Sequence, residues 1–130
     1  MMVFEHVALN VPDSRAMAAW YTTHCGLRIV HAGETPPYVH FVADSTGRVI
    51  MELYTNPKAP VPDYAAQHPL VLHIAFTVAD TEATKARLLE AGATPFSDET
   101  LPNGSRLVML RDPWGIPLQL VRRSKPLGAS

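Results

Sequence analysis

Residues 4–13 read FEHVALNVPD and residues 71–80 read VLHIAFTVAD, so one ten-residue pattern occurs twice in the chain. Each copy has a histidine at its third position and an aspartate at its last. The two histidines, His6 and His73, are separated by 67 residues. Self-similarity at a fixed spacing is typical of repeated structural units, so the sequence predicts two copies of one module.

A second pair of polar residues repeats at the same spacing. Glu52 and Gln119 are also separated by 67 residues, and each lies within a short apolar stretch. The repeat therefore extends from the start of each predicted module to its end.

Each copy predicts the same order of elements. A strand ends at Asp13 or Asp80, and an aspartate there can cap the first amides of a helix. Gly26 can stop the first helix in a left-handed conformation, and Gly92 ends the second. Three short strands are expected in each copy, at 27–33, 38–43 and 48–54 and at 94–98, 105–111 and 116–122. Each copy is therefore expected to form a βαβββ module.

The length of 130 residues favours a single domain. Within residues 1–130 we expect the first module at 1–54, the second at 70–122 and a short tail at 123–130. Residues 55–69 contain four prolines, which interrupt helices and strands. This segment is expected to be an extended linker between the modules.

Side-chain alternation places the repeated polar residues on one face of each sheet. Their apolar neighbours should face the helices, which leaves the opposite face to His6, Glu52, His73 and Gln119. If the two sheets curve toward one another, the eight strands form a curved open barrel around a central cavity. Two imidazoles, one carboxylate and one amide oxygen then converge there, and these are donors for a divalent metal ion.

Residues 111–120 read RDPWGIPLQL and resemble the closing hairpin of the vicinal-oxygen-chelate superfamily. The superfamily usually has glutamate where this chain has Gln119. The resemblance covers residues 3–122 and implies an α+β fold of two tandem βαβββ modules. It also implies one divalent ion (zinc, nickel, cobalt, manganese or iron(II)), with the ligands His6, Glu52, His73 and Gln119.

The resemblance leaves several functions open, because its members include glyoxalase I, methylmalonyl-CoA epimerase, fosfomycin-resistance transferases, extradiol dioxygenases and metal-free bleomycin-binding proteins. The leading hypothesis is a glyoxalase- or epimerase-like lyase or isomerase. In that chemistry the metal binds vicinal oxygens of a small substrate and stabilises an enediolate. Glu52 is the only carboxylate of the set and is the candidate base. The alternatives are an iron(II) extradiol-type dioxygenase and a non-catalytic small-molecule binding or resistance protein.

Four further side chains are candidates for contacting a polar substrate, although an ordinary role on a strand surface fits them equally well. Tyr38 and His40 share a face of one predicted strand, Tyr54 shares the face of Glu52, and Arg106 occupies a comparable place in the second module.

The composition limits the partners. The formal net charge of -1 does not favour nucleic acid, which requires a strongly basic surface. No signal segment or membrane-spanning stretch is visible, and the single Cys25 can form no internal disulfide, so we expect a cytoplasmic protein. Exposed strand edges, together with the many dimers in the superfamily, lead us to expect a homodimer.

Overall fold

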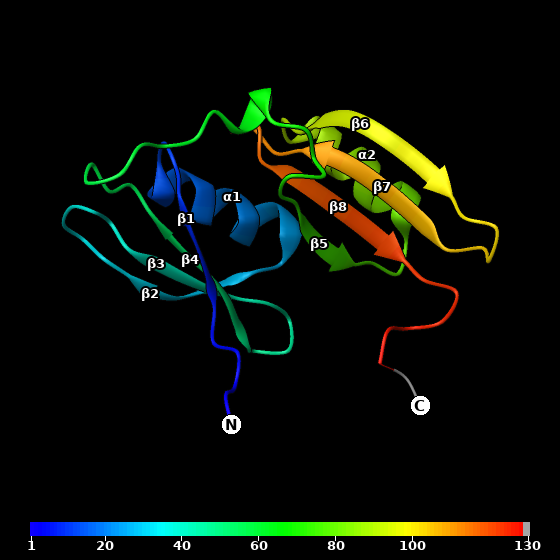
Figure 1. The fold of residues 1–130 in the computed structure, drawn as a ribbon, viewed down its shortest axis with the longest axis horizontal. Coiled ribbons are helices and arrows are strands. Elements are labelled where there is room, and N and C mark those ends of the chain that lie inside the picture. The colour runs from blue at the N-terminus through cyan, green and yellow to red at the C-terminus, as the bar shows by residue number, and fades with distance from the viewer. Residues whose placement is uncertain (129–130) are drawn as a thin grey trace. The chain divides into compact units, whose positions relative to one another are not determined.

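The computed structural model describes residues 1–128. The chain divides into two compact units, Met1–Pro62 and Asp63–Ser130, which we call unit 1 and unit 2. The boundary between them lies within the Pro-rich segment that was predicted as a linker. Each unit contains one sheet and one α-helix (Figure 1).

Unit 1 is a four-stranded sheet with the order β1-β4-β3-β2. Strand β1 pairs with β4 in parallel, and the other pairs are antiparallel. Figure 1 shows α1 against this sheet. The elements are β1 (Val7–Asn10), α1 (Ser14–Cys25), β2 (Arg28–Ala32), β3 (His40–Ala43) and β4 (Val49–Tyr54).

Unit 2 repeats this topology with the strand order β5-β8-β7-β6. Strands β5 and β8 are parallel, as β1 and β4 are. The elements are the 3-10 helix η1 (Tyr64–Ala66), β5 (Ile74–Thr77), α2 (Thr81–Glu90), β6 (Thr94–Thr100), β7 (Arg106–Arg111) and β8 (Pro117–Arg122). The α+β class and the tandem modules are confirmed, with the eight strands divided between two open four-stranded sheets.

The helix ends follow the predicted chemistry. A side-chain oxygen of Asp13 accepts a hydrogen bond from the Ala16 amide at 3.1 Å, and Asp80 does the same for the Ala83 amide at 3.0 Å. These bonds satisfy helix amides that have no partner within the helix. Gly26 ends α1 with a φ of 70°.

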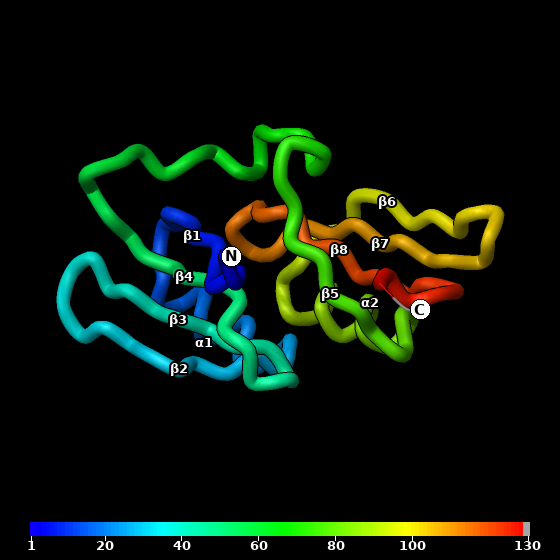
Figure 2. The backbone as a smooth tube through the Cα atoms, turned by 60° about the horizontal axis from the view of Figure 1, so that its bottom comes forward, coloured from blue at the N-terminus to red at the C-terminus, as the bar shows by residue number. Residues whose placement is uncertain are grey.

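The first strand of each module is shorter than predicted. Strand β1 begins at Val7 and β5 begins at Ile74, so His6 and His73 each lie one residue before a strand. Both strands are edge strands that pair on one side only, and their hydrogen-bonded pairing begins at Val7 and at Ile74. The histidines are therefore held by side-chain contacts. In the linker, η1 interrupts an otherwise irregular course, which Figure 2 shows between β4 and β5.

The core of each unit lies between its sheet and its helix. In unit 1, Met51 and Leu53 of β4 are buried together with Met17 and Tyr21 of α1. In unit 2 the buried side chains between the sheet and the helix include Leu88 of α2, Val108 and Leu110 of β7, and Leu118 and Leu120 of β8. Within residues 1–128, none of the helices is long and apolar enough to cross a membrane.

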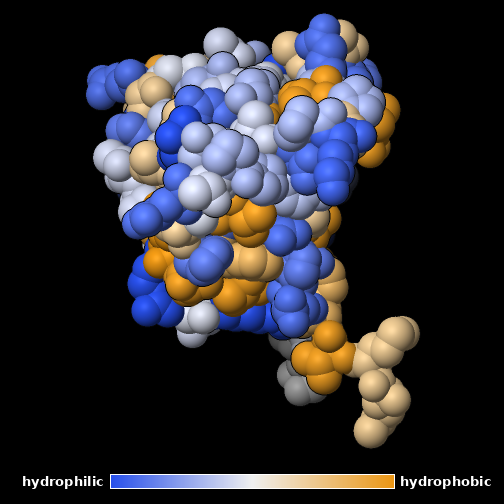
Figure 3. Space-filling model, turned by 90° about the vertical axis from the view of Figure 1, so that its left-hand side faces the viewer, coloured by the Kyte–Doolittle hydropathy of each residue, from blue (hydrophilic) through white to orange (hydrophobic). Residues whose placement is uncertain are grey.

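Several large apolar side chains of unit 1 remain exposed. Phe4, Val7 and Val30 retain 61%, 44% and 43% of their accessible surface. Figure 3 shows apolar side chains gathered in patches among hydrophilic ones on this side of the molecule. Exposed apolar patches of this kind mark surfaces that can bind a partner.

Candidate metal centre

Unit 1 brings together the histidine and the carboxylate predicted for it. Nε2 of His6 lies 3.5 Å from Oε1 of Glu52. In the sheet register Glu52 lies between Ala8 and Phe41, on the face opposite the buried Met51. The predicted placement of Glu52 away from the helix is therefore found.

The second ring nitrogen of His6 is also engaged. Nδ1 lies 2.8 Å from a carboxylate oxygen of Glu5. An ionised carboxylate can only accept, so Nδ1 carries the proton, and in a neutral ring Nε2 faces Glu52 as a lone pair. Two acceptors then face each other across 3.5 Å, an arrangement that a proton or a metal cation would stabilise.

Unit 2 places His73 and Gln119 in the lining of one pocket of about 320 Å³. Nδ1 of His73 lies 2.9 Å from the carbonyl oxygen of Pro69, which can only accept, so Nδ1 is again the protonated nitrogen. Nε2 of His73 is therefore the acceptor. The pocket is lined by His68, Pro69, Leu70, His73, Phe96, Ser97, Glu99, Leu107, Met109 and Gln119.

The two units thus provide matching half-sites, which are His6 with Glu52 in unit 1 and His73 with Gln119 in unit 2. In each, an acceptor holds the Nδ1 proton of a histidine and leaves Nε2 as a possible ligand, which is the usual outer-shell arrangement around metal-binding histidines. A side-chain oxygen, from Glu52 or Gln119, lies on the same face of the same sheet. Among residues 1–128, no three His, Cys, Asp or Glu side chains form a group that could hold a metal. Each unit contributes two of the four predicted donors.

The fold and this repeated half-site agree with a comparison of the sequence with protein families. The model of the Glyoxalase/Bleomycin resistance protein/Dioxygenase superfamily matches residues 3–120. The chain belongs to this superfamily. A comparison with curated proteins found no match.

Solved structures similar to this superfamily member share its fold. A glyoxalase-related enzyme from Fulvimarina pelagi has a TM-score of 0.72 and 21% identity, with 99% of this chain and 94% of that chain covered. Lactoylglutathione lyase from Agrobacterium tumefaciens has a TM-score of 0.65 and 23% identity, with 93% of each chain covered. The antibiotic binding protein TnmS3 from Streptomyces sp. CB03234 has a TM-score of 0.69 and 19% identity, with 95% of this chain and 98% of that chain covered.

Two of the predicted substrate contacts lie away from the polar face of this glyoxalase-type sheet. His40 pairs with Leu53, is only 6% exposed and therefore points into the core beside α1. Tyr38 precedes β3, and its ring lies 3.8 Å from the guanidinium of Arg15 on α1. Neither residue shares the face of Glu52, so neither is part of the proposed site.

Phe41, which was not predicted as a site residue, lies beside Glu52 on the same face of the sheet. It pairs with Glu52 across β3 and β4, and its ring meets the ring of His6 edge-on at 5.3 Å between centroids. Counting pairs back from the turn would place His40 opposite Glu52 instead, because the register shifts by one residue between Val42 and Ala43. Tyr54 lies two residues after Glu52 in the same strand and pairs with Asn10. Its contact with substrate stays a prediction.

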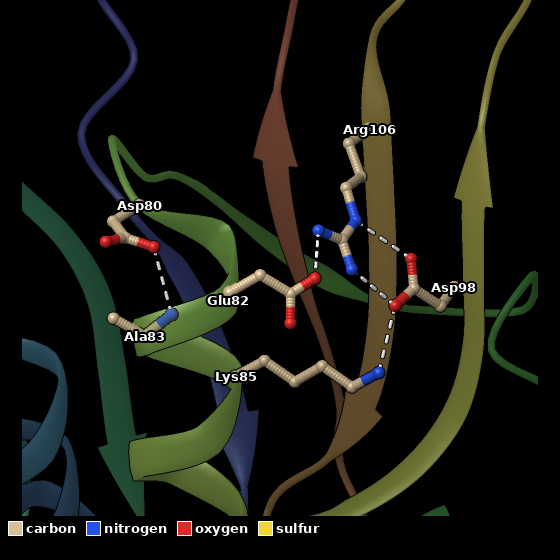
Figure 4. Close-up of polar contacts among 6 residues, drawn as sticks. All are labelled: Asp80, Glu82, Ala83, Lys85, Asp98 and Arg106. Atoms are coloured by element: carbon tan, nitrogen blue, oxygen red, sulfur yellow. Dashed lines mark hydrogen bonds and ion pairs between the residues drawn. The ribbon is translucent and has the colours of Figure 1, made fainter.

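Arg106 is held in an ion cluster on the other side of the unit 2 sheet. Its guanidinium donates to both carboxylate oxygens of Asp98, at 3.0 and 2.7 Å, and forms an ion pair with Glu82 of α2 (Figure 4). Lys85 of α2 also donates to Asp98 at 2.9 Å. These hydrogen bonds, first from Arg106 and then from Lys85, hold the pKa of Asp98 well below its usual range. Arg106 ties β7 to α2 and is not part of the proposed site.

The residues of the unit 2 pocket that the sequence did not identify include Phe96, His68 and Glu99. A β-bulge between Pro95 and Ser97 changes the register at Phe96, and bulges re-aim side chains. Phe96 thereby lines the pocket and meets the ring of His68 at 5.4 Å. Pro95 was the available signal, because proline within a strand favours an edge or a bulge. Glu99 was passed over because β6 extends further than predicted.

Proposed function

We propose that this protein is a metal-dependent lyase or isomerase that acts on a small substrate with vicinal oxygens. One divalent ion would be held by His6, Glu52, His73 and Gln119. The observation that supports this most strongly is the repeated half-site, in which Nδ1 of each histidine is tied to an acceptor. The donor set is chemically suited to a divalent ion because it combines two imidazoles, a carboxylate and an amide oxygen.

The bound ion would polarise the substrate oxygens. Glu52 would move the proton, because it is the only carboxylate of the four donors. Its side chain is 21% exposed and has His6 beside it, so it lies at the surface of the sheet and within reach of a bound molecule. Glu5 would keep His6 in the tautomer that accepts at Nε2.

The neutral Gln119 makes this set less negative than the two-carboxylate set usual in the superfamily. With one carboxylate, a divalent ion would keep a formal charge of +1. Such an ion would be more electrophilic and less tightly held than one with two carboxylates.

Exchanging the two oxygen donors tests the proposal. We expect Glu52→Gln to lose most metal affinity and all proton transfer, so that excess metal does not restore turnover. Gln119→Glu should bind metal at least as tightly with reduced or altered turnover. Elemental analysis, metal titration and assays on aldehyde–thiol adducts and acyl-CoA epimers would measure both effects. The exposed Glu90→Gln on α2 is the control for loss of a carboxylate.

Full metal content and full turnover in Glu52→Gln would exclude Glu52 as ligand and base. Iron in the native protein, with activity that is sensitive to air, would instead support an extradiol-type dioxygenase that uses His6, His73 and Glu52.

A second candidate function is small-molecule binding without chemical change. The unit 2 pocket supports it, because apolar side chains such as Leu70, Phe96 and Met109 form much of its lining. TnmS3, an antibiotic binding protein, has the same fold. Saturable binding of an unchanged ligand by chelator-treated protein would favour this function over catalysis.

A further inference from the structure

Glu99 is a second carboxylate on the polar face of unit 2. It pairs with Leu107 across β6 and β7, and both residues line the pocket that contains His73 and Gln119. The preceding residue, Asp98, points the opposite way into the ion cluster with α2 (Figure 4). Strand alternation therefore separates the two acids, and only Glu99 faces the pocket.

The carboxylate of Glu99 is available to a ligand. Within residues 1–128 it forms no hydrogen bond or ion pair, whereas Asp98 accepts bonds from both Arg106 and Lys85. No lysine or arginine is among the described residues that line the pocket. Arg111 lies 5.5 Å from the Phe96 ring, but it donates to the backbone carbonyls of Tyr64, Gly115 and Gln67.

The sheet register gives the distance that a ligand would span. Gln119 pairs with Met109, which pairs with Ser97, and Glu99 lies two residues beyond Ser97. Two strand spacings and two residues of rise separate the Cα atoms of Gln119 and Glu99 by about 12 Å. Met109 and Leu107 form apolar floor between them. A molecule with oxygens near Gln119 and a polar group near Glu99 would need a short apolar body.

We propose that the substrate is a small molecule whose vicinal oxygens are joined by a short apolar or aromatic body to a hydrogen-bond donor, above all a protonated amine, which Glu99 binds. This inference rests on the proposed function for the oxygen-binding end. It disfavours conjugates whose far end carries peptide carboxylates or phosphates, because no lysine or arginine lines the pocket and Glu99 repels them.

Three catechols that differ only in the side chain test this inference. They are dopamine, 4-methylcatechol and 3,4-dihydroxyphenylacetate, which carry a cationic, a neutral and an anionic group. Calorimetric titration of zinc-loaded protein without oxygen should give the highest affinity for the amine, a lower affinity for the neutral compound and the lowest for the acid. We expect the amine to bind about tenfold more tightly than the neutral compound, as for a charge-assisted hydrogen bond.

Variants at Glu99 assign the preference to this side chain. Glu99→Gln should bring the amine and the neutral compound to similar affinity, and Glu99→Lys should favour the acid. Glu90→Gln removes the same charge from exposed α2 and should keep the original order. Circular dichroism would verify that each variant is folded. If Glu99→Lys does not fold, Glu99→Gln alone is sufficient for the test.

The outcomes separate this inference from the proposed function. Equal affinity for amine and acid in the wild type, including no measurable binding of either, overturns the inference. An unchanged order in Glu99→Gln also overturns it. If zinc does not bind but metal-free protein still prefers the amine through Glu99, the metal centre fails and Glu99 keeps its assigned role.

Discussion

Gly115 is the glycine at which an added Cβ would lie closest to neighbouring atoms. Its φ is +84°, and a Cβ there would lie 2.7 Å from the Ala65 Cβ and 2.9 Å from the Ala65 backbone nitrogen. The β7–β8 turn is therefore packed directly against η1. An alanine would add a steric clash with backbone to the strain of a left-handed conformation.

We expect Gly115→Ala to lower the free energy of unfolding by about 2–4 kcal/mol. Urea unfolding followed by circular dichroism would measure the change. Gly104→Ala is the matched control, because Gly104 has a φ of +88° and open space around its missing Cβ. It should lose only about 1–2 kcal/mol. Equal losses at the two positions would show that contact with η1 is unimportant.

For single residues, alternation and repetition were enough to place Glu52 and Gln119 on the face of each sheet opposite the helix. They failed where a strand did not keep its simple register. Tyr38 adopts a φ of 53° before β3, so it could not be assigned to a strand face. Phe96 faces the pocket because of a bulge, and the extra residue of a bulge is decided by the packing of the whole sheet.

The helix caps make a prediction at the scale of elements. Asp80 accepts from the Ala83 amide at the start of α2, and alanine at position 80 would leave that amide without its partner. Asp80→Ala should therefore lower the free energy of unfolding by about 1 kcal/mol. Asp80→Asn should lower it much less, because asparagine can still accept the cap bond. Thermal or urea unfolding would compare the two. Equal destabilisation by both would mean that charge matters here and the cap bond does not.

The ion cluster between α2 and the sheet predicts a dependence on pH. Arg106 and Lys85 depress the pKa of Asp98 in the folded protein, so the cluster stabilises the fold above the unfolded pKa of about 4. This contribution is lost as the pH falls below that value. Asp98→Asn should therefore destabilise the protein more at about pH 7 than at about pH 3.

Urea midpoints of wild type and Asp98→Asn at several pH values would test this. The exposed Glu34→Gln provides the comparison for general charge effects. A difference between wild type and Asp98→Asn that stays constant over the acid range would contradict the assignment.

Local signals predicted the elements well, because caps and turns depend on a few neighbouring residues. Asp112 illustrates this: its backbone carbonyl accepts from the Gly115 amide at 2.9 Å, as the predicted turn requires. Strand ends were less accurate because they depend on distant pairing. Strand β6 continues to Thr100 since β7 provides partners along its whole length, as far as Arg106.

At the scale of the whole molecule we expect a homodimer. Each sheet is open at two edge strands, and unit 2 leaves Leu70 and Val71 81% and 71% exposed. Open edges and exposed apolar residues favour association between copies. Size-exclusion chromatography with light scattering should give twice the chain mass of 14.3 kDa. A mass of one chain over the working concentration range would contradict this.

The opposite orientations of Asp98 and Glu99 have a consequence for how this chain could diversify. Asp98 is linked to α2 through Arg106, and none of the ion pairs involved uses the pocket face of β6. Substitutions at positions 97, 99 and 107 would therefore leave the ion cluster intact, whereas substitutions at positions 98 and 106 would break it. We therefore expect the pocket face of β6 to accept new side chains with little effect on the fold, whereas deletion of one residue within β6 would turn the following side chains to the opposite face.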